Sequence, residues 1–395
     1  MSIELPNGRA RVAFYNDPRV RSLVYQLALF AGVAFLVYAA ASNAIDNLER
    51  AHITSGFGFW NTTAGFDISQ TLIPYDSQVS TYGRAFWVGL LNTLLVAGLG
   101  IIFATVLGFI IGISRLSKNW LLAKAAGGYV ETIRNIPLLL QLLFWYNAVL
   151  KSLPETRDSI VIPGGAYLNN RGLYLPQPIF ERGFAAVLIA LIGGIAIAIF
   201  FHIWARKRQE RTGKQAPAFW VTIAAVIGLP VVVLALAGFP VRFVFPAAGR
   251  FNISGGVELL PEFGALLFGL SIYTAAFIAE VVRAGILAVS RGQIEAAYSL
   301  GLKPRPTLRL IVVPQAMRVI IPPLTSQYLN LTKNSTLAVA IGYPDLVQIF
   351  TGTVLNQTGQ AVTVVAVTMA VYLTISLVTS LAMNIYNRRV ALVER

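Results

Sequence analysis

Long apolar runs alternate along this chain with short basic or polar connections. Several runs reach about 20 residues, long enough for a helix to cross a bilayer core of roughly 30 Å. Because every backbone N–H and C=O in that core needs an internal partner, each run is predicted to be an α-helix. The sequence therefore predicts an all-α polytopic membrane protein with about eight transmembrane helices. The predicted spans are 21–44, 85–113, 129–150, 184–205, 218–238, 262–288, about 320–345 and 364–387.

Two of these spans depart from a simple apolar run. The first, 21–44, ends in Ser-Asn-Ala, which resembles the small-residue cleavage site of a secretory signal. About 20 residues, many charged or polar, precede it and its apolar core is long, so a retained span is expected instead. The span at 320–345 is interrupted by Pro322, Pro323 and Lys333.

Basic residues gather in every second connection. They lie in the N-terminal tail, in the loops around 115–134, 206–214 and 283–318, and in the C-terminal tail. Cytoplasmic loops of membrane proteins carry the excess of Lys and Arg, so both termini are predicted to be cytoplasmic. The net charge of +14 is then an asymmetry between the two membrane faces, and nucleic acid is not expected as a partner.

The residue inventory excludes several classes of enzyme. The chain has no cysteine and only two histidines, His52 and His202, so neither a metal centre nor a Ser/His/acid set is expected. A phosphate-binding G-x-x-x-x-G-K-[ST] motif is absent as well, since the only Gly-Lys pair, Gly213-Lys214, is followed by Gln215. The chain is therefore not expected to bind ATP or to catalyse a reaction.

The stretch from Glu295 to Ala316 is unlike the apolar runs on either side of it. Pro304 and Pro306 break it, so a helix, a turn and a second helix starting near Pro306 are predicted, forming an elbow on the membrane surface. Such an elbow suits docking in a groove of another protein; a helix that only rests on lipid headgroups is the alternative. The first helix is indicated by small and apolar residues at three- to four-residue spacing, namely Ile294, Ala297, Leu300 and Gly301.

The same stretch carries a longer pattern. Glu295-Ala296-Ala297, three residues, Gly301, nine residues and Ile311-Val312-Val313-Pro314 resemble the E-A-A–x3–G–x9–I–x–L–P loop of ABC importer permeases, with Val313 in the Leu place. In that family the loop is the coupling helix, which inserts into a cleft of the ATP-binding subunit. The resemblance implies a coupling role for Glu295, Ala296, Ala297, Gly301 and Pro314.

Other segments are similar to the polar amino-acid branch of that family. Residues 89–109 resemble its first core span, 129–146 its second with Arg134 to Pro137 as the R-x-x-P start, 273–302 its third and 330–342 its fourth. The similarity covers 85–150 and 262–387, which implies a type I importer permease core of five spans.

The remaining parts resemble the larger build of the general L-amino-acid importers. Residues 1–84 hold a tail, an extra span and a periplasmic loop, and 151–261 insert a loop and two extra spans. Within the core, 262–387 hold the third to fifth core spans and the coupling loop 291–316. Residues 388–395 form a cytoplasmic tail. The long loops at 45–83 and 151–183 either cap the protein, contact a partner or simply connect spans.

The resemblance also implies partners for an ATP-driven importer in a bacterial inner membrane. Two ATPase subunits would hold ATP and Mg, and a periplasmic binding protein would deliver amino acids. A second permease, expected to be a different but related chain, would complete the pathway, with membrane lipid around it.

Charged residues inside spans are costly and usually face a cavity or a partner. Glu131 with Arg134, and Glu280 with Arg283, are i,i+3 pairs that act either as structural ion pairs or as a gate. Lys333 follows two prolines and starts a polar group that could bind a zwitterionic amino acid at a broken helix. The candidate substrate path is Lys333, Asn334, Ser335, Thr336, Glu280, Tyr273, Thr274, Asn92 and Thr93, where bonds between spans are the alternative for the last four.

Asn334 stands where many relatives have Asp, and we hypothesise that losing this charge relaxes a preference for cationic substrates. An ion-coupled secondary transporter is the main alternative function. It would need a buried carboxylate at mid-membrane, whereas the sequence offers Lys333 there. A membrane-embedded enzyme lacks a convergent catalytic set, and a purely structural protein would not need the polar group at 333–336.

Overall fold

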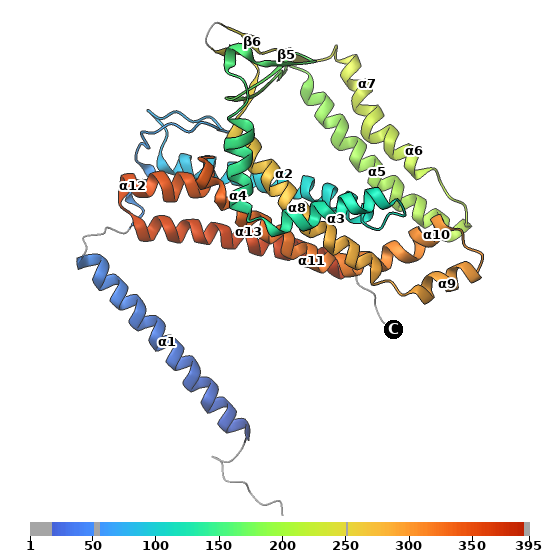
Figure 1. Cartoon of the computed structure of the whole chain (residues 1–395), viewed down its shortest axis with the longest axis horizontal. Helices are drawn as coiled ribbons and strands as arrows, with labels where there is room; N and C mark the ends of the chain where they lie inside the picture. Colours follow the sequence, from blue (N-terminus) through green and yellow to red (C-terminus); the bar gives the residue numbers. More distant parts are fainter. Residues whose placement is uncertain (1–17, 51–55, 250–251, 391–395) are drawn as a thin grey trace, which may run out of the picture.

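The computed structural model describes residues 18–50, 56–249 and 252–390 (Figure 1). The outer parts of both predicted tails, and His52, lie outside the described residues. Within them, seven helices are long and apolar enough to cross a membrane, and a bent pair makes eight if it counts as one span. This confirms the predicted number of spans. The long helices are α1 (Pro18–Arg50), α2 (Tyr82–Ser114), α5 (Phe184–Thr212), α6 to α7 (Ala218–Leu236), α8 (Pro261–Leu287), α10 to α11 with the turn that follows (Pro304–Ile341), and α13 (Ala361–Val390).

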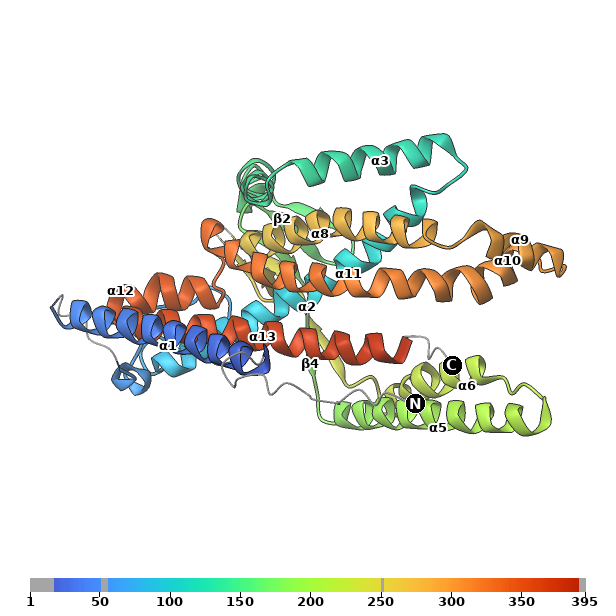
Figure 2. The same ribbon diagram turned by 90° about the horizontal axis from the view of Figure 1, so that it is seen from below.

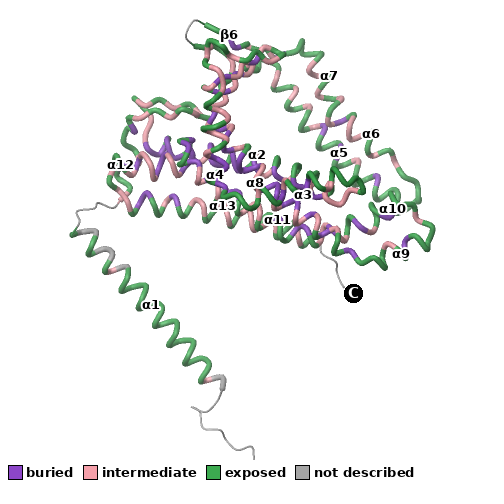
Figure 3. The backbone as a smooth tube through the Cα atoms, viewed as in Figure 1, coloured by how far each residue is buried: buried purple, intermediate pink, exposed green. Residues whose placement is uncertain are grey.

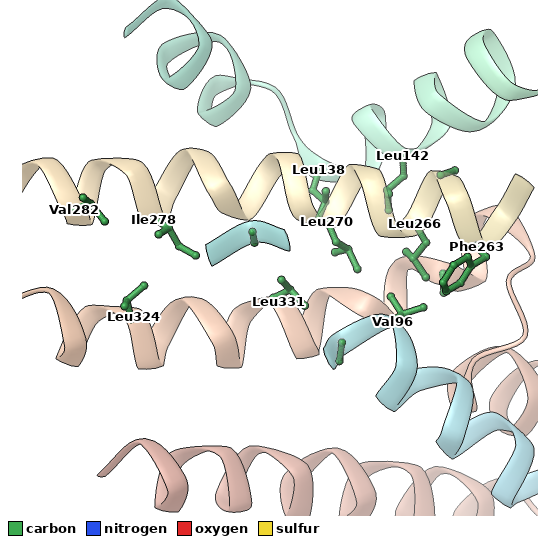
Figure 4. Close-up of a cluster of buried hydrophobic side chains, with 14 of the residues drawn as sticks. Val96, Leu138, Leu142, Phe263, Leu266, Leu270, Ile278, Val282, Leu324 and Leu331 are labelled. Atoms are coloured by element: carbon green, nitrogen blue, oxygen red, sulfur yellow. The ribbon is translucent and has the colours of Figure 1, made fainter. Parts of the chain in front are cut away.

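The buried core lies where α2, α8 and α11 (Val313–Asn334) pack together, as Figure 3 shows. Helix α8 is the central element, because α2, α3, α4 and α11 all contact it. Its buried side chains Leu270 and Ile278 point towards α2 and α11, where Val96 and Leu331 meet them (Figure 4).

Small residues allow α2 to approach α8 closely. Gly100, Ala104, Gly108 and Gly112 recur every fourth residue and so share one face of α2. A Cβ on Gly108 would lie 2.5 Å from Cγ2 of Ile278, and one on Gly112 would lie 2.7 Å from a backbone oxygen of α8. In a membrane, where apolar side chains gain little from leaving lipid, such close backbone packing is a main source of helix association.

The predicted single span at 129–150 is wrong in its geometry. Helix α3 (Trp120–Asn135) and the helix that begins with α4 (Leu138–Leu143) and runs to Leu150 are bent by 104°. Ile136 is extended because Pro137 follows it, and this ends α3. The buried Gln141 donates from Nε2 to the carbonyls of Ile133 and Ile136, both at 2.9 Å, which satisfies two acceptors at the break.

The predicted helix, turn and start of a second helix are confirmed, but the end of the second helix was predicted wrongly. Helix α9 (Arg291–Ser299) is present and a second helix begins at Pro304, near the predicted Pro306, whereas a separate span starting at 320 is not present. Instead, α10 (Pro304–Thr307), a π-helical turn and α11 form one continuous helix. Pro314 supplies no N–H, and the π-helical turn directly before α11 absorbs this irregularity without ending the helix.

The loops flanking the inserted helices contain short antiparallel strands. The four-stranded sheet has the order β1-β2-β3-β8, with Tyr167 opposite Tyr174 and Leu173 opposite Leu259. β4 pairs with β5 just before α5 and just after α7, so the inserted segment closes on itself. The strands are β1 (Ile160–Ile162), β2 (Ala166–Asn169), β3 (Gly172–Leu175), β4 (Gln177–Phe180), β5 (Val241–Val244), β6 (Ala247–Ala248), β7 (Ile253–Ser254) and β8 (Val257–Leu259).

Helix α5 forms a hairpin with α6 (Ala218–Ile223) and α7 (Leu229–Leu236). The two arms approach closely at Gly194, where a Cβ would collide with the carbonyl of Ala225. Seen from below in Figure 2, the hairpin lies to one side of the core helices. Most of its side chains are exposed, as are those of α1, which stands apart in Figure 1.

The other end of the core is covered by the segment before α2. Phe59 and Trp60 lie in a short 3-10 helix, Gly58–Asn61, and pack against Tyr82, Phe86 and Phe350 as an aromatic cluster. Of the three roles considered for the loop at 45–83, its described part, 56–81, therefore serves as an ordered cover over the core. The chain after Ile341 returns through a π-helical turn, Gln348–Val354, and α12 (Leu355–Thr358) to α13.

We predict that Gly108→Ala destabilises the protein whereas Gly98→Ala does not. The added methyl at 108 would collide with Ile278 and force the helices apart, at a cost of about 1–3 kcal/mol. Gly98 lies on the same helix with no atom within 4 Å of such a methyl, so only the better helix propensity of Ala acts there. Thermal unfolding of both purified variants in detergent measures this, and equal melting temperatures would contradict the packing argument.

Candidate functional site

Helix α9 ends in a Schellman motif. Gly301 has a φ of +77°, its N–H donates to the carbonyl of Tyr298 at 2.9 Å, and the N–H of Leu302 donates to the carbonyl of Ala297 at 3.1 Å. This left-handed conformation favours glycine, which gives a physical reason for Gly301 in the E-A-A pattern. The turn holds Leu300 out from the protein with 82% of its surface exposed.

The motif residues differ in exposure. Glu295 and Ala296 are exposed, whereas Ala297 is buried. Pro314 is exposed, but it lies within the continuous helix that leads into α11 and not at the end of an elbow. Helix α9 thus presents one face beyond the core, at the end of the molecule where α8 also ends (Figure 1).

Of the two predicted ion pairs, only one is present among the described residues. Glu280 binds Arg283 through an Oε1–Nη2 contact of 2.6 Å and also pairs with Arg115, the residue after α2. Arg115 was not predicted, because it is far from Glu280 in sequence. The expected Glu131–Arg134 pair is not formed; Arg134 instead stacks over the ring of Phe277, at 5.0 Å from its centre.

The polar group in the last core helix lies where the helix changes type. The α-helix stops at Asn334 and a 3-10 helix, Ser335–Ile341, continues it. Lys333 is exposed and Asn334 is half-buried. Ser335 is buried and donates to the carbonyl of Thr332 at 2.8 Å, whereas Thr336 donates to the carbonyl of Lys333 at 2.8 Å.

Asn92 and Thr93 are fully buried and join α2 to the segment that follows the 3-10 helix. Asn92 donates from Nδ2 to the carbonyl of Pro344 at 2.8 Å, and Thr93 accepts from the N–H of Leu346 at 3.0 Å. Asn92 also donates to the carbonyl of Gln70 at 2.9 Å, in the outer loop.

Tyr273 and Thr274 lie on different faces of α8. Tyr273 is half-buried and stacks against Phe277 at 4.9 Å, whereas Thr274 is buried. The structure therefore does not collect all path candidates at one point: Lys333, Asn334 and Thr336 are accessible, and Asn92, Thr93, Thr274 and Ser335 are inside the packed core.

Asp345 is a buried carboxylate that the sequence analysis missed. One of its oxygens accepts the N–H of Gln348 at 2.8 Å and the other accepts the hydroxyl of Tyr372 at 3.2 Å. Asp345 lies between the last two spans, and burial raises its pKa to about 7. A Pro-Asp pair followed by apolar residues is a helix N-cap signal that could have identified it.

The raised pKa makes stability depend on pH. Since the folded pKa lies above the ordinary value of 3.8, the stability that the protonated carboxyl contributes is complete below about pH 4 and is lost as pH rises through about 7. We therefore expect Asp345→Asn to flatten the fall of the melting temperature between pH 5 and pH 8, by the equivalent of about 2.5 kcal/mol.

The matched control is Asp76→Asn, which removes an exposed carboxylate that also accepts a backbone N–H, that of Gln78 at 2.8 Å. The melting temperature of this control should vary with pH as that of wild type does. Parallel plots of melting temperature against pH for wild type and Asp345→Asn would contradict the raised pKa of Asp345.

These features define a class of protein. Polar and charged side chains lie on core helices that span a membrane, a helix projects beyond their common end, and no group of three or more metal-binding side chains occurs in the described part of the chain. This is the build of a polytopic helical membrane protein.

Residues 104–392 match the family of binding-protein-dependent transport system inner membrane components, and the chain belongs to this family. It is 53% identical over 385 residues to the general L-amino acid transport system permease protein AapQ of Rhizobium johnstonii, which covers 98% of this chain and 96% of that one. It is 51% identical to the putative amino-acid ABC transporter permease protein YhdX of Escherichia coli, over 96% of this chain and 97% of that one. It is 42% identical to the glutamate/glutamine/aspartate/asparagine transport system permease protein BztB of Rhodobacter capsulatus, over 96% of each chain.

The chain is thus a multi-pass inner-membrane permease subunit of an ABC importer, as the E-A-A pattern indicated. It is a transport component and not an enzyme, and membership of this family implies a separate ATPase and a binding protein as partners. The ion-coupled alternative is not favoured.

Proposed function

We propose that this chain forms one transmembrane half of a broad-specificity importer of L-amino acids, with both termini in the cytoplasm. The observation that carries the substrate class is the match to three permeases named for amino-acid transport over nearly the whole chain, inserted segment included. The basic residues at the α9 end of the bundle support the orientation. Residues 85–150 and 262–387 would be the permease core and 151–261 the insertion.

Two ATPase subunits would bind ATP and Mg and receive the coupling helices. The exposed face of α9 supports this role, because Leu300 and Tyr298 are held outwards and no described element covers them. A large apolar side chain held out by a rigid turn is a good anchor for a groove in a partner. Closure of the ATPase pair would then move α9, and with it α8 and α11.

The second permease is supported by the position of Lys333. A Lys side chain exposed within an apolar span is costly when it faces lipid, so the surface around it calls for a water-filled path or another subunit. A different but related permease that packs against this face would provide both, with the water-filled path running between the two permeases. The periplasmic binding protein would then deliver amino acids at the opposite end of the bundle from α9.

Lys333, Asn334 and Thr336 are our proposed substrate-path residues. An ammonium group and neighbouring amide and hydroxyl groups offer donors for a carboxylate and acceptors for an ammonium. Tyr273 and Glu280 would lie deeper along the path, and the ion pairs of Glu280 would act as a gate near the α9 end. Asn92, Thr93, Thr274 and Ser335 would shape the path through the backbone that they hold.

The coupling role is tested by the double variant Glu295→Lys with Gly301→Trp. A reversed charge and a bulky ring on the docking face should reduce the ATPase recovered with the tagged permease by roughly tenfold or more. Mass spectrometry after a pull-down from native membranes measures this.

Glu210→Lys with Gly213→Trp is the matched control. It changes another exposed acid and another left-handed glycine, with a φ of +70°, at the same end of the molecule. The control should retain the ATPase, and both forms should retain the second permease. If the first variant keeps its ATPase, α9 is not the coupling helix.

The substrate path is tested by uptake of labelled L-amino acids into proteoliposomes that contain the whole transporter and its binding protein. Lys333→Ala should lower uptake roughly tenfold, because a charged donor to the substrate carboxylate is lost. Asn334→Asp should raise the uptake of arginine relative to glutamate. Lys124→Ala, which removes an exposed lysine of α3, is the control. Unchanged uptake in Lys333→Ala would exclude Lys333 from the path.

A further inference from the structure

A cavity of about 490 Å³ lies between the inserted hairpin and the coupling region. It is lined by Gln215, from the connection between α5 and α6, and by Arg305, Pro306, Arg309 and Leu310, from α10 and the π-helical turn after it. Four of these residues fall within the coupling loop 291–316, but none of them is among the E-A-A residues to which a coupling role was assigned.

The cavity is strongly basic. Arg305 and Arg309 are exposed, and none of the ion pairs among the described residues involves either of them. In the stretches 206–215 and 303–310 the only acidic side chain is Glu210, which pairs with Arg206 at 3.3 Å; Glu295 lies on α9, which contacts α10. An anion is therefore the complementary ligand. Further basic residues near the cavity lining in sequence are Arg206, Lys207, Arg208, Arg211, Lys214 and Lys303.

Aromatic side chains place the cavity at the level of the lipid headgroups. Trp204 near the end of α5 lies under the guanidinium of Arg208, at 5.2 Å, and Phe219 and Trp220 at the start of α6 are 68% and 69% exposed. Trp is enriched where a membrane meets water, and Lys and Arg reach from there towards the headgroups.

Apolar groups lie directly beside the two arginines. Leu308 and Leu310 are 56% and 64% exposed on the same turn as Arg309. A phosphate on the guanidinium groups with acyl chains along these leucines would satisfy both kinds of surface, whereas a soluble anion would leave the leucines in water.

We propose that this cavity binds the phosphate headgroup of an anionic phospholipid, which bridges the inserted hairpin and the start of the α10–α11 helix. Arg305 and Arg309 contact the phosphate and Gln215 donates from its amide. The bound lipid fixes the hairpin beside the coupling segment, and this gives the two inserted spans a role that the core does not supply.

The test uses the complete complex purified from native membranes and a fluorescent phosphatidylglycerol titrated in detergent micelles, with phosphatidylcholine as the zwitterionic comparison. Each basic residue near an anionic lipid contributes about a fivefold factor, so Arg305→Gln with Arg309→Gln should weaken phosphatidylglycerol binding roughly 30-fold. Binding of phosphatidylcholine should not change.

Lys207→Gln with Arg211→Gln is the matched control, since it removes two exposed charges from the same basic surface but none from the cavity lining. It should keep phosphatidylglycerol affinity near the wild-type value. Equal losses in the two double variants would mean diffuse attraction and would overturn the site. If the Arg305/Arg309 variant loses the ATPase but keeps its lipid affinity, the two arginines contact the ATPase and the lipid site is wrong. Size-exclusion chromatography confirms that each complex is intact.

Discussion

The close packing of α8 against its neighbours is the constraint on which the rest of the structure depends. Gly108 and Gly112 let α2 approach it, Gly269 accommodates Leu142 of α4, and Gly285 accommodates Ile320 of α11. Because lipid is as apolar as the side chains themselves, burial alone would not hold these helices together, and shape complementarity has to do so. The polar groups of the transport function can then occupy the faces that α8 leaves free.

The same packing would carry the proposed movement of α9 into the core. Only three residues, 288–290, separate α9 from α8, and the long helix that contains α11 starts just after the Schellman turn at Gly301. A movement of α9 would therefore act on α8 and α11, which pack against each other. Glu280 lies on α8 near the same end of the bundle. Its ion pairs with Arg115 and Arg283 connect the end of α2 to α8.

Local signals in the sequence were sufficient for the span count, for α9 and for the family, because apolar length and the E-A-A spacing are properties of neighbouring residues. The bend at Pro137 was missed because a long apolar run hides a break that only Gln141 and the extended Ile136 stabilise. The effect of Pro314 as a helix breaker was overestimated, because a π-helical turn before it lets the helix continue. Arg115 with Glu280, and Tyr372 with Asp345, meet only after folding, so no pattern in the chain indicates them.

The inserted segment follows a different structural logic from the core. Its helices pack on each other through Gly194 and Ala225, its ends are joined by β4 and β5, and its outer faces remain exposed, so the contacts of α5 are made mainly within the segment itself. Such a unit can be added between two core spans without disturbing the contacts of α8. Its position then depends on what fills the cavity between it and the α10–α11 helix. The charged side chains that line this cavity are Arg305 and Arg309. With the lipid site proposed above, α5 to α7 would respond to lipid charge and would not line the substrate path.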